Sequence, residues 1–122
     1  MGNESFKLGE IKFKPKETFN KILIEAIDDG LLSLGLSVRH AIYWHLEKKT
    51  LIKKAEIPYR LEVFLKGLHS IFGPGASIIE MLIVKKLYEK LGLSFIETHD
   101  YGFMDYVKKA KEDYEKSEKI AL

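Results

Sequence analysis

The sequence contains no cysteine, and this absence removes several kinds of chemistry at once. Structural disulfides, a thiol nucleophile and a zinc site with cysteine ligands are all excluded. Arginine is also scarce, because Arg39 and Arg60 are the only two in 122 residues. With so few arginines, the chain has few planar guanidinium groups that can make bidentate hydrogen bonds to phosphates or base edges. The missing residue types therefore exclude a thiol enzyme and disfavour a nucleic-acid binder.

Long apolar runs and a strong net charge are absent as well. The longest apolar stretches span a few residues, such as 81–84, whereas a bilayer span needs about 20. Residues 1–16 have no apolar core of signal-peptide length. The net charge of +2 comes from 20 basic and 18 acidic residues, without a concentrated basic field. These features predict a cytoplasmic protein with no membrane segment.

What is present is a helical pattern in a chain long enough for one domain. With 46% hydrophobic residues, 122 residues can build a core without a metal or a disulfide. Residues 6–13 partly alternate at period two, which predicts a short extended segment. Apolar residues recur at helical spacing in five stretches: 16–35, 37–49, 61–72, 75–91 and 103–119. The predicted fold class is all-α, a compact bundle of about five helices in a single domain, 1–122, with a short N-terminal extended segment.

Glycines and one serine give the expected helix boundaries. Gly30 lies inside the first helix, because the apolar stripe continues beyond it, and it predicts close approach of another helix. Ser37 is the expected N-cap of the second helix. Gly73 fits a left-handed residue after the third helix, and Gly92 should end the fourth. The fourth helix, 75–91, is apolar over more than half its circumference and is expected to be central.

Histidines and carboxylates suggest little catalytic chemistry. His40 and His45 are five residues apart and so point to different faces of one helix, which is wrong for a zinc site. Glu97, His99 and Asp100 share a loop that could hold a cation, a general base or a small ligand, but a solvated loop is favoured. We expect no catalytic residue, no metal and no cofactor, and hence no enzyme.

The carboxylates of the first helix have a structural interpretation. Glu25 and Asp29 share one helix face, with Asp28 beside them. Paired carboxylates can perform acid–base chemistry, but no opposing pair is evident. A surface stripe or an ion pair with Arg39 is the favoured interpretation.

The turn Gly73-Pro74-Gly75 suggests two kinds of binding site, one for an anion and one for DNA. It lacks the spacing and the Lys-Ser/Thr pair of a P-loop, yet the N–H groups at Gly75 and Ala76 could attract an anion. The 61–91 segment also has the layout of a helix-turn-helix. Its lysines lie in the C-terminal half of the second helix, whereas recognition contacts usually come from the N-terminal part. DNA binding therefore stays an alternative that is not favoured.

Four side chains are candidates for a protein interface. Tyr43 and Trp44 lie away from part of the apolar stripe on their helix, and exposed aromatic residues often mark interfaces. Ile78 and Met81 fit either core or interface. The apolar excess of the fourth helix and the unpaired extended segment predict a homodimer.

Several segments together resemble a small archaeal family, the nitrosopumilus-type output domain. The resemblance covers about residues 18–93 and is carried by these stretches: Ala26 to Leu31, Ser33 to Gly35, Ser37 to Arg39, Ala41 to Tyr43, His45 to Lys49, Ile57-Pro58, Phe64, Leu68, Ile71 to Ala76, Ile79-Glu80 and Leu82 to Tyr88. It implies an archaeal regulatory module, an output domain of signal transduction, with no catalytic residues to carry over. The leading expectation is a non-enzymatic module that acts through protein contacts. A DNA-binding regulator and a small-ligand-binding domain are the alternatives.

Overall fold

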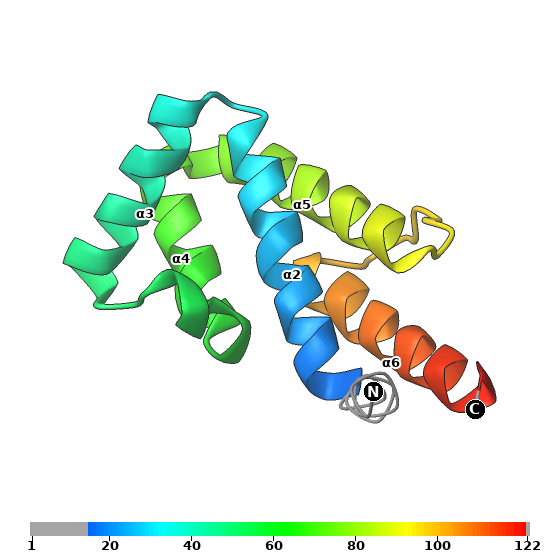
Figure 1. The fold of residues 1–122 in the computed structure, drawn as a ribbon. Helices are drawn as coiled ribbons and strands as arrows, with labels where there is room; N and C mark the ends of the chain where they lie inside the picture. Colours follow the sequence, from blue (N-terminus) through cyan, green and yellow to red (C-terminus); the bar gives the residue numbers. More distant parts are fainter. Residues whose placement is uncertain (1–14, 122) are drawn as a thin grey trace, which may run out of the picture.

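Five α-helices make up the protein in the computed structural model, which describes residues 15–121 (Figure 1). They are α2 (Pro15–Leu32), α3 (Leu36–Thr50), α4 (Leu61–Phe72), α5 (Ala76–Leu91) and α6 (Phe103–Ala121). Two 3₁₀ turns, η1 (Lys54–Tyr59) and η2 (Gly73–Gly75), flank α4. The part of the chain that is described contains no strand, and the all-α prediction is confirmed. The extended segment predicted over 6–13 lies outside the described residues.

Helix α2 runs through the middle of the bundle, with α3 and α4 on one side and α5 and α6 on the other (Figure 1). The five apolar side chains predicted for its stripe are all buried: Phe19, Leu23, Ala26, Ile27 and Leu31. Burying a large apolar side chain contributes roughly 1.5–3 kcal/mol. The stripe of α2 is therefore the main source of the cohesion between the two halves.

Helices α2 and α5 approach each other closely at Gly30. A Cβ added to Gly30 would lie 2.7 Å from Ile83 Cγ1 and 3.3 Å from Ile83 Cα. Any side chain at position 30 would thus press on the α5 backbone. The predicted role of Gly30, close approach of another helix inside a continuous α2, is confirmed.

Helix α5 shares the central position with α2, since it contacts α2, α4 and α6. Ile79, Ile83 and Leu87 are buried on one face, and Val84 and Tyr88 are buried as well. Neighbouring helices of the same chain therefore satisfy most of its apolar excess, which weakens that excess as an argument for a dimer. Ile78 is different, because it remains 70% exposed.

The stretch from Leu61 to Leu91 is long and apolar enough to span a membrane by length and composition, with a mean hydropathy of 1.4. It is divided between α4 and α5 by the turn at 73–75. Phe64 and Leu68 of α4 and Ile83 of α5 are fully buried inside the bundle. These three side chains form part of the core, and 33% of the apolar window is buried inside the bundle.

Two helix boundaries differ from the sequence prediction. Gly35, not Ser37, is the N-cap of α3, and no side chain caps this end. The backbone of Gly35, with φ 115°, makes the reversal, and its carbonyl accepts the first helical bond from Arg39 N–H. Gly73 has the expected positive φ of 57°, but its ψ of −135° lies outside the left-handed helical region. Gly92 ends α5 in the left-handed conformation, as predicted.

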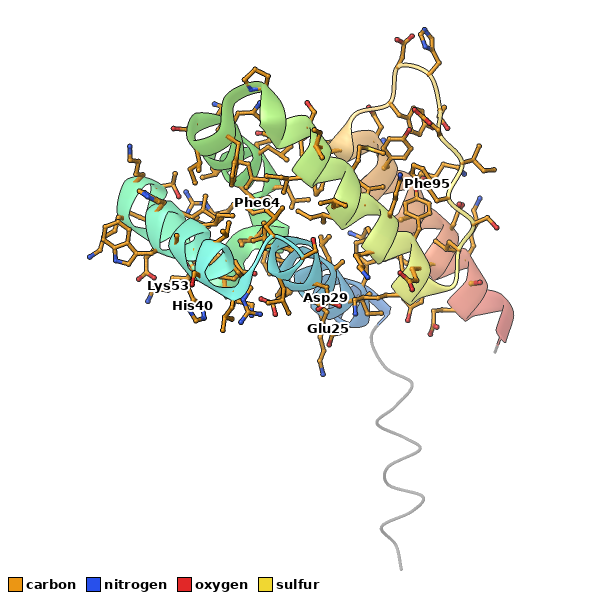
Figure 2. All side chains as sticks on the ribbon, turned by 90° about the horizontal axis from the view of Figure 1, so that it is seen from above. Glu25, Asp29, His40, Lys53, Phe64 and Phe95 are labelled. Carbon is orange, nitrogen blue, oxygen red and sulfur yellow. The ribbon has the colours of Figure 1, made fainter. Side chains whose placement is uncertain are left out.

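The connection between α5 and α6 is held by tyrosines. The Tyr106 hydroxyl accepts a hydrogen bond from Thr98 N–H at 2.9 Å, and the Tyr88 hydroxyl donates to the Tyr106 carbonyl at 2.8 Å. Phe95 packs against the rings of both tyrosines, and Figure 2 shows Phe95 beside α5. Burial raises the pKa of Tyr88 to about 12. The loop is therefore anchored at its base.

Candidate functional site: the faces of helix α3

Helix α3 has an inner face fixed to the bundle by core contacts and by a polar network. Ile42 and Leu46 are buried against the rest of the protein. Asp28 of α2 accepts hydrogen bonds from Arg39 Nη1 at 2.9 Å and from the Tyr43 hydroxyl at 3.0 Å. Lys54 Nζ of η1 lies 3.0 Å from the same carboxylate. One acidic residue therefore joins α2, α3 and η1, and the expected ion pair with Arg39 is confirmed.

The hydrogen bonds and charges of this network shift the pKa values of Asp28 and Tyr43. Burial alone would raise the pKa of the Asp28 carboxyl, but hydrogen bonds from Lys54 and Tyr43 and the charges of Lys54 and Arg39 outweigh it, so this pKa lies below its ordinary value. Burial, followed by the bond to Asp28, raises the pKa of Tyr43 above its ordinary value. Tyr43 is therefore a half-buried structural residue, and its hydroxyl has a partner within the chain.

A second side of α3 carries large apolar side chains exposed to solvent. Leu36, Trp44 and Leu51 are 54%, 58% and 78% exposed. With His40 and Glu47 between them, they follow each other at intervals of four, four, three and four residues. This spacing places the first four side chains on one side of the helix, and Leu51, the C-cap residue, follows them at the same interval. We call this set, Leu36, His40, Trp44, Glu47 and Leu51, the α3 outer face; His40 is labelled in Figure 2.

Leu51 is unusual in its backbone as well as its exposure. It ends α3 in the left-handed conformation, with φ 58° and ψ 27°, and its N–H donates to Glu47 O. That conformation costs a non-glycine residue roughly 1–2 kcal/mol. Strained residues of this kind cluster at functional sites. A large apolar side chain that is both strained and exposed is therefore a candidate contact residue.

Trp44 is framed by its neighbours on α3. Lys48 Nζ lies over the indole ring, 5.8 Å from its centroid, and the His45 ring meets it edge-on at 5.2 Å. These contacts limit the freedom of the indole without covering it. A large side chain that is already held in place loses little entropy when a partner covers it.

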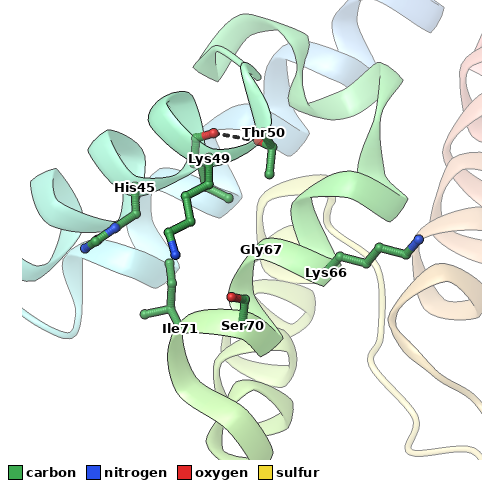
Figure 3. Close-up of a pocket in the computed structure, with 8 residues that line it drawn as sticks. His45, Lys49, Thr50, Lys66, Gly67, Ser70 and Ile71 are labelled. Carbon is green, nitrogen blue, oxygen red and sulfur yellow. Dashed lines mark hydrogen bonds between the residues drawn. The ribbon is translucent and has the colours of Figure 1, made fainter.

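A cleft of about 230 Å³ opens between α3 and α4 (Figure 3). Helix α3 contributes His45, Leu46, Lys49 and Thr50, and α4 contributes Lys66, Gly67, Ser70 and Ile71. In Figure 3 the Lys49 side chain extends toward Ile71, whereas Lys66 points away. The Thr50 hydroxyl donates to the Leu46 carbonyl and is thereby satisfied. We call this space the α3–α4 cleft.

The predicted interface residues do not form one surface. Trp44 and Ile78 are exposed, but they lie on α3 and α5, which are not among the main packing partners in the bundle. Met81 is half-buried against the core. Leu36 and Leu51, which sequence reasoning missed, join Trp44 instead. Their positions at the two ends of the predicted helix were the available signal.

At the predicted anion contact, the N–H of Ala76 already has partners within the chain. Ala76 is fully buried, and its N–H donates to the carbonyls of Gly73 and Pro74. Gly75 has right-handed helical backbone angles, so the chain passes from η2 into α5 without opening. The anion prediction at Gly75 and Ala76 therefore gains nothing from the geometry.

The remaining polar clusters are solvated or paired. Glu97, His99 and Asp100 are exposed at the loop tip, and the described residues hold no cluster with metal-ligand geometry. His69 of α4 pairs with Glu80 of α5 at 2.7 Å. The α5 lysines are also engaged: Lys90 with Asp29 of α2 at 2.7 Å, and Lys85 over the Phe95 ring. These two lysines of α5 therefore have partners within the chain.

Comparison with known proteins gives no match to a family model, to a curated protein or to a solved structure. The resemblance to the archaeal output domain thus remains a prediction from the sequence.

Proposed function

We propose that the protein is a non-enzymatic regulatory module of signal transduction that acts through protein contacts of the α3 outer face, and that it forms a homodimer. The observation that carries the proposal is the exposure of Trp44 between Leu36 and Leu51. Tryptophan is enriched among the residues that dominate interface energy. The sequence resemblance to an archaeal output domain supports the regulatory role and a place in the archaeal cytoplasm.

The spacing of the α3 outer face is self-complementary. In a two-fold antiparallel pairing of two α3 helices, with the axis between positions 43 and 44, Leu36 faces the partner's Leu51. In the same register His40 faces the partner's Glu47, and the two Trp44 rings meet beside the axis. An isologous interface needs this property, since each residue must suit its symmetry mate. A second copy of the chain is therefore the partner that the pattern fits best.

The expected dimer is weak. The α3 outer face is one helical stripe of about 24 Å at 1.5 Å per residue. Five side chains on each subunit bury less than the roughly 1,200 Å² of a standard stable interface. A concentration-dependent equilibrium between monomer and dimer follows, which suits a module whose contacts must be reversible.

Sedimentation velocity over a concentration series tests the proposal. The wild-type protein should shift from monomer toward dimer as its concentration rises. Trp44→Ala should remain monomeric, while Ile96→Ala, which removes an even more exposed apolar side chain from the α5–α6 loop, should behave as wild type. Monomer at every concentration would refute the homodimer. Equal loss of dimer in both variants would refute the assignment to α3.

DNA binding is tested separately by a gel-shift titration at several salt concentrations. Phosphate contacts would give a steep loss of affinity with salt. We expect no shifted band, because the α5 lysines are engaged within the chain.

A further inference from the structure

The α3–α4 cleft is basic on a molecule of nearly balanced charge. Its described lining contains no acidic side chain and includes His45, Lys49 and Lys66. Of the two lysines, Lys49 extends toward Ile71 and Lys66 points away (Figure 3), so Lys49 is the amine available to a ligand. The described residues provide no ion-pair partner for Lys49 or Lys66, whereas Lys54, Lys90 and Lys109 each have one. An amine beside a cleft without a carboxylate attracts an anion.

The interior of the cleft is apolar, with few polar groups. Leu46 and Ile71 provide apolar walls, and Gly67 adds no side chain between them. Lys49 extends across the space in Figure 3, and the Ser70 hydroxyl lies on the α4 side. Apolar walls with a few convergent polar groups are the usual composition of a small-molecule site.

We propose that the α3–α4 cleft binds a small carboxylate with an apolar body of about five carbons. The volume of about 230 Å³ holds seven or eight groups of water size, at roughly 30 Å³ each. The carboxylate accepts hydrogen bonds from the Lys49 amine and the Ser70 hydroxyl, and the apolar body displaces water from Leu46 and Ile71. This site is separate from the α3 outer face and does not depend on dimerisation.

The donors in the cleft favour a single negative charge. No arginine lines it, so the planar fork that suits a phosphate is absent from the described lining. The lining residues also come from the later parts of α3 and α4, away from the helix N-termini that bind phosphate groups. One amine and one hydroxyl match one carboxylate.

The test is an NMR titration of the ¹⁵N-labelled full chain with hexanoate, which has eight heavy atoms. Hexanoate should cause saturable shifts at Gly67, Ser70 and Lys49, and it should change the fluorescence of Trp44, the only tryptophan, through its contact with His45. Acetate lacks the apolar body, and hexylamine carries the opposite charge. Both should bind at least about tenfold more weakly.

Adjacent lysines provide a matched pair of variants. Lys49→Met should weaken hexanoate binding by about tenfold or more, the range expected for a charged hydrogen bond. Lys48→Met makes the same charge change over the Trp44 ring, outside the cleft, and should leave the affinity unchanged. Ser70→Leu fills the cleft and should abolish binding, with circular dichroism confirming that each variant is folded.

Absence of saturable shifts up to the solubility limit of hexanoate would overturn the proposal. The proposal would also be overturned if hexylamine bound as tightly as hexanoate, or if the Lys48 and Lys49 variants lost hexanoate affinity equally. Either result would show that the lining of the cleft does not select a negative charge. Sedimentation in the presence of hexanoate keeps the outcome separate from that of dimerisation.

Discussion

Gly30 offers a direct test of how α2 and α5 fit together. In an ordinary helix, Gly→Ala stabilises by roughly 1 kcal/mol because alanine is the better helix former. At position 30 the added methyl would lie 2.7 Å from Ile83 Cγ1 and 3.3 Å from Ile83 Cα. The Ile83 backbone cannot move without displacing α5. Overpacking of this kind costs roughly 1–3 kcal/mol, and the gain in helix propensity offsets about 1 kcal/mol of it. Gly30→Ala should therefore lower the free energy of unfolding by up to about 2 kcal/mol.

Gly67→Ala is the matched control. A Cβ at Gly67 would overlap Leu46 Cδ2, the end of a flexible side chain, and the α3–α4 cleft beside Leu46 gives this methyl group space to move. Here the gain in helix propensity should nearly offset the contact. The stability should stay within about 0.5 kcal/mol of wild type.

Urea unfolding followed by circular dichroism at 222 nm, at low protein concentration, measures both changes. In a thermal melt followed at the same wavelength, at about 4 °C per kcal/mol, the melting temperature of Gly30→Ala should fall by up to roughly 8 °C. A stabilised Gly30→Ala variant would refute the close approach of α2 and α5. A larger loss at Gly67 than at Gly30 would refute the distinction between a rigid and a mobile neighbour.

Three further predictions concern polar and strained positions. Asp28→Asn should lower the free energy of unfolding by about 1–2 kcal/mol, since Arg39 and Lys54 lose charge-assisted bonds to the carboxylate. The pKa of Asp28 is lowered in the folded protein, so the carboxylate stabilises the fold above about pH 4 and this contribution is lost as the pH falls through the folded pKa. The difference between variant and wild type in urea titrations should therefore shrink in acid. Leu51→Gly should stabilise the monomer by about 1 kcal/mol in thermal unfolding, because glycine adopts the left-handed conformation without strain. The same variant should weaken the dimer in sedimentation. A destabilised monomer would contradict the inference that the backbone at Leu51 is strained. Tyr106→Phe should speed hydrogen exchange at Thr98 N–H by about tenfold, and unchanged protection there would show that the hydroxyl does not hold the loop.

Helix positions and core residues could be predicted because each depends on local periodicity. The apolar stripe of α2 appears as predicted, and the interruption at Gly30 was correctly interpreted because Leu31 continued the stripe. The start of α3 was placed wrongly at Ser37, because both serine and glycine favour the N-cap and only the backbone shows that Gly35 makes the reversal.

The candidate surfaces were harder to predict because they depend on what lies opposite each helix. Tyr43 and Trp44 are adjacent and similar in the sequence, yet Asp28 of α2 engages one and leaves the other exposed. The apolar excess of α5 suggested an external partner, but α6 covers part of it. The α3–α4 cleft joins residues some 20 positions apart and has no signature in either helix alone.

Cysteine cross-linking tests the proposed pairing of two α3 helices most directly, because the chain has no cysteine of its own. Two single variants, His40→Cys and Glu47→Cys, are oxidised separately and as a mixture, with Ile96→Cys as the measure of random collision. The antiparallel register places position 40 opposite the partner's position 47, and a disulfide requires Cβ atoms roughly 4 Å apart. The mixture should therefore form disulfide-linked dimer containing one copy of each variant, faster than either variant alone and faster than the Ile96 control. Cross-linking of the mixture no faster than the control, or faster reaction of His40→Cys with itself, would contradict the two-fold contact through the α3 outer face.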